Sequence, residues 1–227
     1  MAGLVEGGPQ TVSPISLKKA KSLYSRVQSL TPHQFLNFLD SYAKPPSTSK
    51  IGLMGRRTQR NKTDLILIAK KPVSNTSENK VIQPLQQNRI AKAIKDGKFE
   101  NPIEKNVAEK IAENLNFFTV LESQKDIALS IQQGTFGDPI SDTITEKIVE
   151  KLEVFKVYEA QKVIATAIKD GKFGNQISDT IAKKIVEKLE VFKDSEAQKM
   201  IATAIKDGKF GNPISDTIAE KIVEKLE

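Results

Sequence analysis

Apolar side chains follow a helical spacing through most of the chain after residue 85. Pairs of isoleucine four residues apart recur along it, at Ile90 and Ile94, Ile127 and Ile131, Ile164 and Ile168, and Ile201 and Ile205. Side chains four residues apart lie on one face of a helix. A second stripe follows each pair, as at Ile144, Ile148, Leu152 and Phe155. The pattern therefore predicts two amphipathic helices, one after the other, at each place.

The two stripes belong to a unit that repeats every 37 residues. We place the units at 86–122, 123–159, 160–196 and 197–227, the last being six residues short. The third and fourth units differ at three of the 31 positions that they share. Each unit reads as a helix, a loop and a second helix, and one such hairpin cannot bury its own apolar face. The fold class is therefore all-α, with the hairpins stacked as an open solenoid or packed as a closed bundle.

The loop inside each unit contains an invariant glycine and phenylalanine. The glycines stand where a helix takes a left-handed residue after its last turn: Gly97, Gly134, Gly171 and Gly208. The phenylalanines are expected to be buried: Phe99, Phe136, Phe173 and Phe210. Because Lys209 is replaced by Thr135 and Asp207 by Gln133 in the second unit, the loop's polar chemistry does not repeat. We interpret it as structural, not as a phosphate or calcium loop.

The sequence signals for the ends of the helices differ from unit to unit. Ser-Asp pairs at 141–142, 178–179 and 215–216 predict N-caps for the second helices, whereas Glu104-Lys105 predicts a weaker cap in the first unit. The segment EVFKVYEAQK (153–162) contains no helix breaker, which predicts a helix running across it. Ser195 and the residues after it read as a capping box that starts a new helix.

The N-terminal third has a different organisation. Residues 1–13 read as a disordered tail and 14–44 as a helical hairpin whose second helix starts at the capping box Thr31-Pro32-His33-Gln34. That helix has the densest aromatic patch, formed by Phe35, Phe38, Leu39 and Tyr42. The patch is expected to pack within the hairpin, to bind a protein partner, or both.

Residues 45–85 read as a basic linker. Eight Lys or Arg and one acid, Asp64, lie between Lys44 and Lys71. Arg56, Arg57 and Arg60 are candidates for binding an anionic surface, although a solvated linker is the plainer interpretation. A strand-like run at 65–69 contains Leu65, Ile66, Leu67 and Ile68. We expect it to pair with a partner's sheet edge or to pack under another element.

The amino-acid composition excludes several kinds of functional site. The chain has no cysteine and one histidine, His33, which excludes disulfides, thiolate sites and multi-histidine metal sites. The acidic residues follow Glu-Lys helix patterns, and we find no nucleophile–base set or cofactor loop. We therefore expect no enzyme, no cofactor and no metal. We read no signal peptide and no apolar run long enough to span a membrane, so the default is a cytoplasmic protein.

Two segments carry a resemblance to a known family. Two features, the helix TPHQFLNFLDSYAK (31–44) and the recurring KIVEKLE (147–153, 184–190 and 221–227), stand in a cysteine-free chain rich in Lys, Ile and Asn. Together they resemble accessory subunits of the bacterial Dot/Icm type IVB secretion coupling complex, of the DotY type. The resemblance implies a subunit docked on partner proteins through its N-terminal third, at the inner face of the membrane, with a repeat part that helps to recruit protein substrates.

The expected function is thus a non-enzymatic protein-interaction subunit or adaptor. Two alternatives remain open. The chain could be a secreted helical-repeat effector, or it could bind nucleic acid or another anionic surface through its basic linker. Co-purification from the native host, recovery in a recipient cell and a salt-sensitive shift of duplex DNA separate the three.

Overall fold

The computed structural model describes residues 27–44 and 83–226, and it confirms that this part of the chain is all-helical. The α-helices are α2 (Pro32–Ala43), α4 (Pro84–Lys95), α5 (Lys105–Glu113), α6 (Leu121–Gln132), α7 (Asp142–Glu150), α8 (Tyr158–Lys169), α9 (Asp179–Glu187), α10 (Ser195–Lys206) and α11 (Asp216–Leu226). Short 3-10 turns follow three of them: η1 (Leu115–Phe117), η2 (Leu152–Val154) and η3 (Leu189–Val191). The described residues contain no strand.

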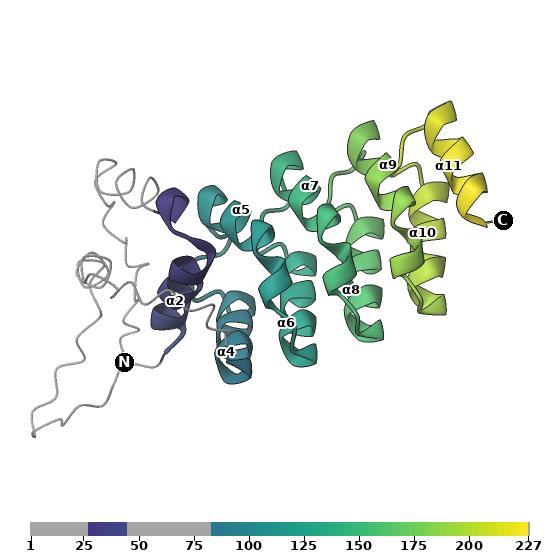
Figure 1. Cartoon of the computed structure of the whole chain (residues 1–227). Helices are drawn as coiled ribbons and strands as arrows, with labels where there is room; N and C mark the ends of the chain where they lie inside the picture. Colours follow the sequence, from purple (N-terminus) through teal and green to yellow (C-terminus); the bar gives the residue numbers. More distant parts are fainter. Residues whose placement is uncertain (1–26, 45–82, 227) are drawn as a thin grey trace, which may run out of the picture.

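The helices form two rows (Figure 1). One row contains α2, α4, α6, α8 and α10, and the other contains α5, α7, α9 and α11, each helix packing on its neighbours in the row. From α4 onward the chain alternates between the rows, so each hairpin adds one helix to each row. The result is an open, elongated stack and not a closed bundle.

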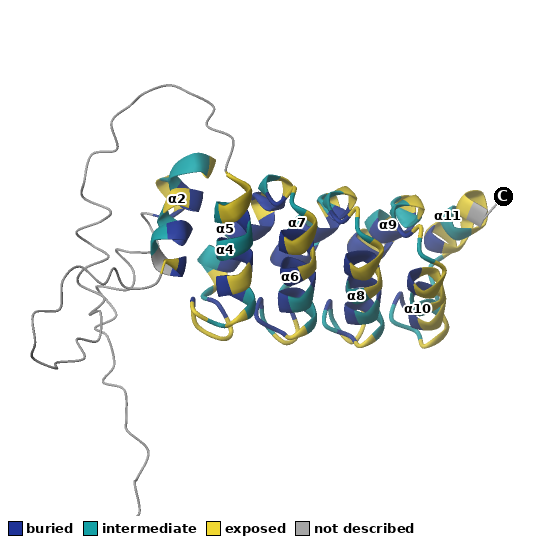
Figure 2. Ribbon diagram, turned by 90° about the horizontal axis from the view of Figure 1, so that it is seen from below, coloured by how far each residue is buried: buried dark blue, intermediate teal, exposed yellow. Residues whose placement is uncertain are grey.

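One continuous apolar core lies between the rows (Figure 2). The isoleucines of the first-row helices are fully buried except Ile205, which is partly buried. The four loop phenylalanines are buried as well. The inward faces predicted from the helical spacing are therefore confirmed.

The loops connect through backbone hydrogen bonds to the following hairpin. Ile103 N–H donates to the Thr135 carbonyl, Ile140 to Lys172 and Ile177 to Lys209, each at 2.8 Å. Donors and acceptors both advance by 37 residues at each step. A loop edge therefore joins consecutive hairpins in addition to the helix packing.

Glycine is required twice in each loop of the last three hairpins. Gly171 has φ +78°, the left-handed conformation expected after a helix, and Gly174 has φ +114°. The second position was not predicted. In the first hairpin it is occupied by Glu100 at φ +86°, a conformation that strains a residue with a Cβ.

The helix expected across residues 153–162 does not form, so this prediction was wrong. α7 ends at Glu150, Phe155 leaves the helical region at φ −79° and ψ 78°, and α8 begins at Tyr158. The Phe155 carbonyl accepts from Gln161 Nε2 at 3.0 Å, and Lys156 N–H donates to Gln124 Oε1 at 2.9 Å. These side chains replace the bonds that a continuous helix would make, so no glycine or proline is needed to break it.

The predicted caps were also partly wrong. Ser141 and Ser178 occupy N-cap positions but their hydroxyls make no capping bond, and the Ser141 Oγ is buried without a hydrogen-bond partner. Glu104, expected to be the weaker cap, accepts from Asn106 and Val107 N–H. The longer Glu side chain can reach back to those donors. Asp194, one residue before the predicted Ser195, caps α10. The capping box at Thr31 is confirmed.

Candidate interaction surfaces

The aromatic patch proposed as a partner site lies largely inside the protein. Phe35 and Leu39 are 0% exposed, and Phe38 is partly buried and stacks on Phe35 with ring centroids 6.5 Å apart. α2 packs on α4, and these side chains are buried there. Phe35 and Leu39 are thus unavailable to a partner in this structure. The side chain of Tyr42 lies outside the described residues, as do Arg56, Arg57, Arg60, Leu65, Ile66, Leu67 and Ile68.

An ion pair fixes α2 on α4. Arg89 Nε lies 2.7 Å from Asp40 Oδ1, and Lys44 Nζ lies 3.0 Å from the other oxygen of the same carboxylate. Lys95 of α4 pairs in the same way with Asp126 of α6, and this hydrogen bond raises the pKa of Lys95. Both carboxylates are almost fully buried. A buried carboxylate with its cation holds neighbours in register, so these pairs are structural.

A glutamine in the first turn of α4, α6 and α8 clamps the next hairpin. Gln87 Oε1 accepts from Thr119 N–H and Val120 N–H at 2.9 and 3.0 Å. Gln124 accepts from Lys156, and Gln161 from Lys193, each at 2.9 Å. The sequence contains the signal, since Gln recurs at 87, 124, 161 and 198. The interpretation of the loop is unaffected, but a polar contact outside the loop does repeat and was not predicted.

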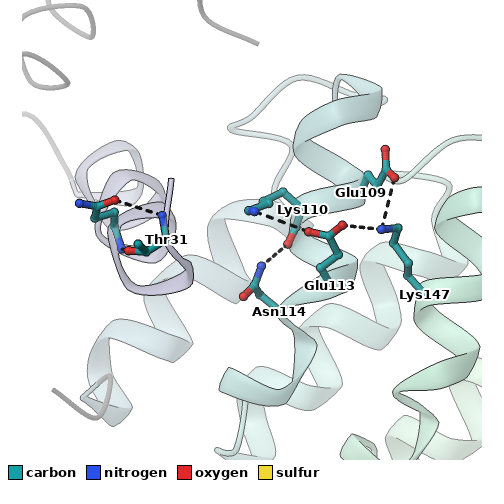
Figure 3. A network of polar contacts seen from close by, with 7 residues as sticks. Thr31, Glu109, Lys110, Glu113, Asn114 and Lys147 are labelled. Atoms are coloured by element: carbon teal, nitrogen blue, oxygen red, sulfur yellow. Dashed lines mark hydrogen bonds and ion pairs between the residues drawn. The ribbon is translucent and has the colours of Figure 1, made fainter. Parts of the chain in front are cut away.

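Lysines of the second row bind glutamates of the preceding helix (Figure 3). Lys147 of α7 points between Glu109 and Glu113 of α5, with Nζ 3.3 Å from Glu109 Oε1. Desolvation lowers the pKa of Lys147, but the bonds to Glu113 and Glu109 outweigh it and raise the pKa above its ordinary value.

The same arrangement recurs at the next step. Lys184 of α9 binds Glu146 and Glu150 of α7, each at 2.7 Å. These hydrogen bonds raise the pKa of Lys184, and the bond from Lys184 lowers the pKa of Glu150. We call this series of lysine–glutamate pairs the ladder.

The ladder is interrupted between α9 and α11. The position that corresponds to Glu109 and Glu146 is Lys183, so Lys221 of α11 lacks one of the two glutamates that its predecessors bind. Glu187, which corresponds to Glu113 and Glu150, contributes to raising the pKa of Lys221. Lys221 pairs instead with Glu224 of its own helix at 2.6 Å. Lys183 also lines an open hollow between the first turns of α9 and α11, together with Asp179, Thr180, Ser215, Thr217 and Ile218. No group of potential metal ligands occurs among the described residues.

Large apolar side chains are exposed along one edge of the first row. Leu85 of α4 is 79% exposed, Leu121 of α6 is 63% exposed and Tyr158 of α8 is 58% exposed. All three lie in the first turn of their helices. Because Gln87 bonds to Val120, which directly precedes Leu121, and Gln124 bonds to Lys156, these first turns are adjacent. We call Leu85, Leu121 and Tyr158 the apolar edge.

Comparison with known proteins does not assign the chain to a family. No protein-family model, curated protein or solved structure matches it. Within the described residues, no helix combines the length and the apolar character needed to cross a membrane.

Proposed function

We propose that this chain is a non-enzymatic protein-interaction subunit, built as an array of four 37-residue helical hairpins after an N-terminal helical layer. The apolar edge carries the proposal. Water-exposed leucine and tyrosine side chains at 58–79% exposure, placed in the first turns of three neighbouring helices, are typical of a surface that another protein covers.

The chemistry around the apolar edge favours a protein partner. Exposed glutamates, Glu122 and Glu159, and exposed lysines, Lys125 and Lys162, flank it. A nucleic acid would meet these carboxylates, whereas the mixed charges suit the polar rim of a protein interface. Hydrogen bonds at 37-residue intervals support the four-hairpin array, because each hairpin repeats the contacts of the last.

The resemblance of residues 31–44 and of the KIVEKLE segments supports a more specific role. We place the subunit in a type IVB secretion coupling complex, where it helps to recruit protein substrates. In this role α2 docks on the chain's own α4, so the partner contacts belong to other surfaces than Phe35 and Leu39.

The chain itself supplies substitutions that test the apolar edge. Leu85→Glu copies Glu122, and Leu121→Ser with Tyr158→Ser copies Ser195 of α10, so the triple variant should fold normally. Full-length protein purified from the native host should bring down a stoichiometric complex that the triple variant loses. A control with Thr143→Ser, Thr180→Ser and Thr217→Ser, which are exposed in the other row, should retain the complex.

The outcomes separate the candidate functions. Subunits of a coupling complex in the eluate support the specific role. An unchanged complex in the triple variant contradicts the use of the apolar edge. Recovery of the chain inside a recipient cell, without a stable complex in the host, contradicts the subunit role and favours a secreted effector.

A further inference from the structure

Within the described residues, no helix covers one face of the last hairpin, whereas the equivalent face of the preceding hairpin is covered. Residues that are buried in α8 and α9 recur unchanged, 37 positions later, in α10 and α11. Ala165, Ala182 and Val186 are 0% exposed, whereas Ala202 and Ala219 are exposed and Val223 is 56% exposed. We call this face of α10 and α11, formed by Gln198, Ala202, Ile205, Ala219, Ile222 and Val223, the terminal face (Figure 2).

Polar groups on the terminal face also match those of the preceding hairpin. Ile177 N–H donates to the Lys209 carbonyl, and Gln161 Oε1 accepts from Lys193 N–H. The corresponding Ile214 N–H and Gln198 Oε1 have no partner within the described residues. The terminal face therefore presents one backbone donor and one amide acceptor in the geometry that elsewhere binds a hairpin.

We propose that the terminal face binds a helical hairpin of a partner protein with the chemistry of α10 and α11. The first helix of this hairpin carries small or branched apolar residues at the spacing of Ala197, Ile201 and Ala204, which are buried against α8. A loop carbonyl equivalent to that of Lys209 accepts from Ile214 N–H. A backbone N–H ahead of the first helix donates to Gln198 Oε1.

The established interface between α8–α9 and α10–α11 argues for this occupant. The six side chains of the terminal face are identical to those at the equivalent positions of α8 and α9, so the two surfaces have the same complementary shape there. At the rim, Glu220 stands where the covered surface has Lys183. The first hairpin of a second copy could not dock in this way, because its first helix, α4, is already covered by α2. Phe35, Leu39 and the pair of Arg89 and Asp40 hold α2 there. The occupant is therefore a hairpin whose first helix is not covered by another helix.

The probe is a synthetic peptide with the sequence of residues 193–227. Mixed with the full-length chain, it should bind in fluorescence anisotropy and gain helicity beyond the sum of the separate spectra, because an isolated hairpin of this length is marginal in water. Ala202→Arg with Val223→Lys in the chain should weaken binding by about tenfold or more, since both place an unpaired charge in the contact. The same should result from Ile201→Asp in the peptide.

Controls separate this proposal from the proposed function. Both substituted residues of the chain are exposed, so circular dichroism should show an intact fold. The apolar-edge triple variant should bind the peptide normally, because it leaves the terminal face unchanged. Binding unaffected by Ala202→Arg with Val223→Lys, or no binding at all, overturns the proposal. Dimerisation of the chain that these substitutions abolish overturns it in favour of a second copy.

Discussion

At the scale of single residues, Glu100 is the clearest departure from the pattern of its own fold. It has φ +86° where Gly137, Gly174 and Gly211 stand in the later hairpins. Contacts of the Cβ destabilise an L-residue in this region by about 1–2 kcal/mol. Glycine avoids these contacts, but it loses more conformational freedom on folding, which offsets part of the gain in stability.

Glu100→Gly should therefore raise the free energy of unfolding by roughly 0.5–1 kcal/mol. Urea denaturation measures it, with an unchanged slope expected. Glu100→Gln, which keeps the Cβ and removes the charge, measures what the Glu100 carboxylate itself contributes. An equal gain in both variants would assign the effect to charge and not to the backbone.

The glutamine clamps give a second residue-scale prediction. Gln161 bonds to Lys193 N–H and the Phe155 carbonyl, whereas Gln198 makes one of the two corresponding bonds. Gln161→Leu should reduce the free energy of unfolding by roughly 2–3 kcal/mol, because backbone groups lose their partners.

Gln198→Leu is the matched control for that loss. It removes one bond at a more exposed site, so roughly 1 kcal/mol or less is expected. Equal losses at both positions would mean that the clamp to the next hairpin contributes nothing.

At the scale of elements, the ladder explains how second-row helices are held together. The ladder lacks one glutamate on α9, and Lys183→Glu restores the carboxylate found at Glu109 and Glu146. The variant should unfold at a higher temperature in calorimetry, because Lys221 gains an acceptor on α9. The gain should disappear when Lys221→Gln is added, and Lys183→Gln should recover only the part due to removed repulsion.

The ladder also has a predictable response to acid. Glu150 has a folded pKa below its ordinary value of 4.5 because Lys184 binds it. Its contribution to stability is present above that ordinary value and is lost as the pH falls through the folded pKa. The difference in stability between the native chain and Lys184→Gln should therefore shrink below about pH 4.5. Lys199→Gln, at an exposed lysine outside the ladder, should show no such change.

Helices and their inward faces could be predicted from the sequence because spacing alone fixes them. Ile164 and Ile168 point inward in any packing that buries their face. The end of α7 could not be predicted, since it depends on Gln124 and Gln161, which arrive from different hairpins. Exposure could not be predicted either: Phe35 and Tyr158 are both aromatic residues on amphipathic helices, and only the placement of α2 on α4 decides that the first is buried.

At the scale of the whole molecule, each hairpin contacts only its neighbours in the stack. Stability in such a stack is distributed along its length, and an end with one neighbour opens more readily than the middle. Within the described residues, the interior hairpins have two neighbours each, whereas the hairpin of α10 and α11 has one.

Amide hydrogen exchange should therefore be faster in α11 than in α7 and α9, despite their similar sequences. The difference should narrow when the peptide of residues 193–227 is bound at the terminal face. Equal protection of all three helices in the free chain would show that the stack opens as a single cooperative unit.

The clamps have a consequence for how such a chain can change its length. Gln87, Gln124 and Gln161 each reach a backbone donor 32 residues further along. A deletion of one whole period leaves every remaining glutamine with a donor at the same separation. A deletion of half a period leaves clamps and loop bonds unmatched on both sides of the cut. The protein is thus free to evolve in discrete steps of one hairpin, and the near-identity of its last two hairpins is what the most recent such step would leave behind.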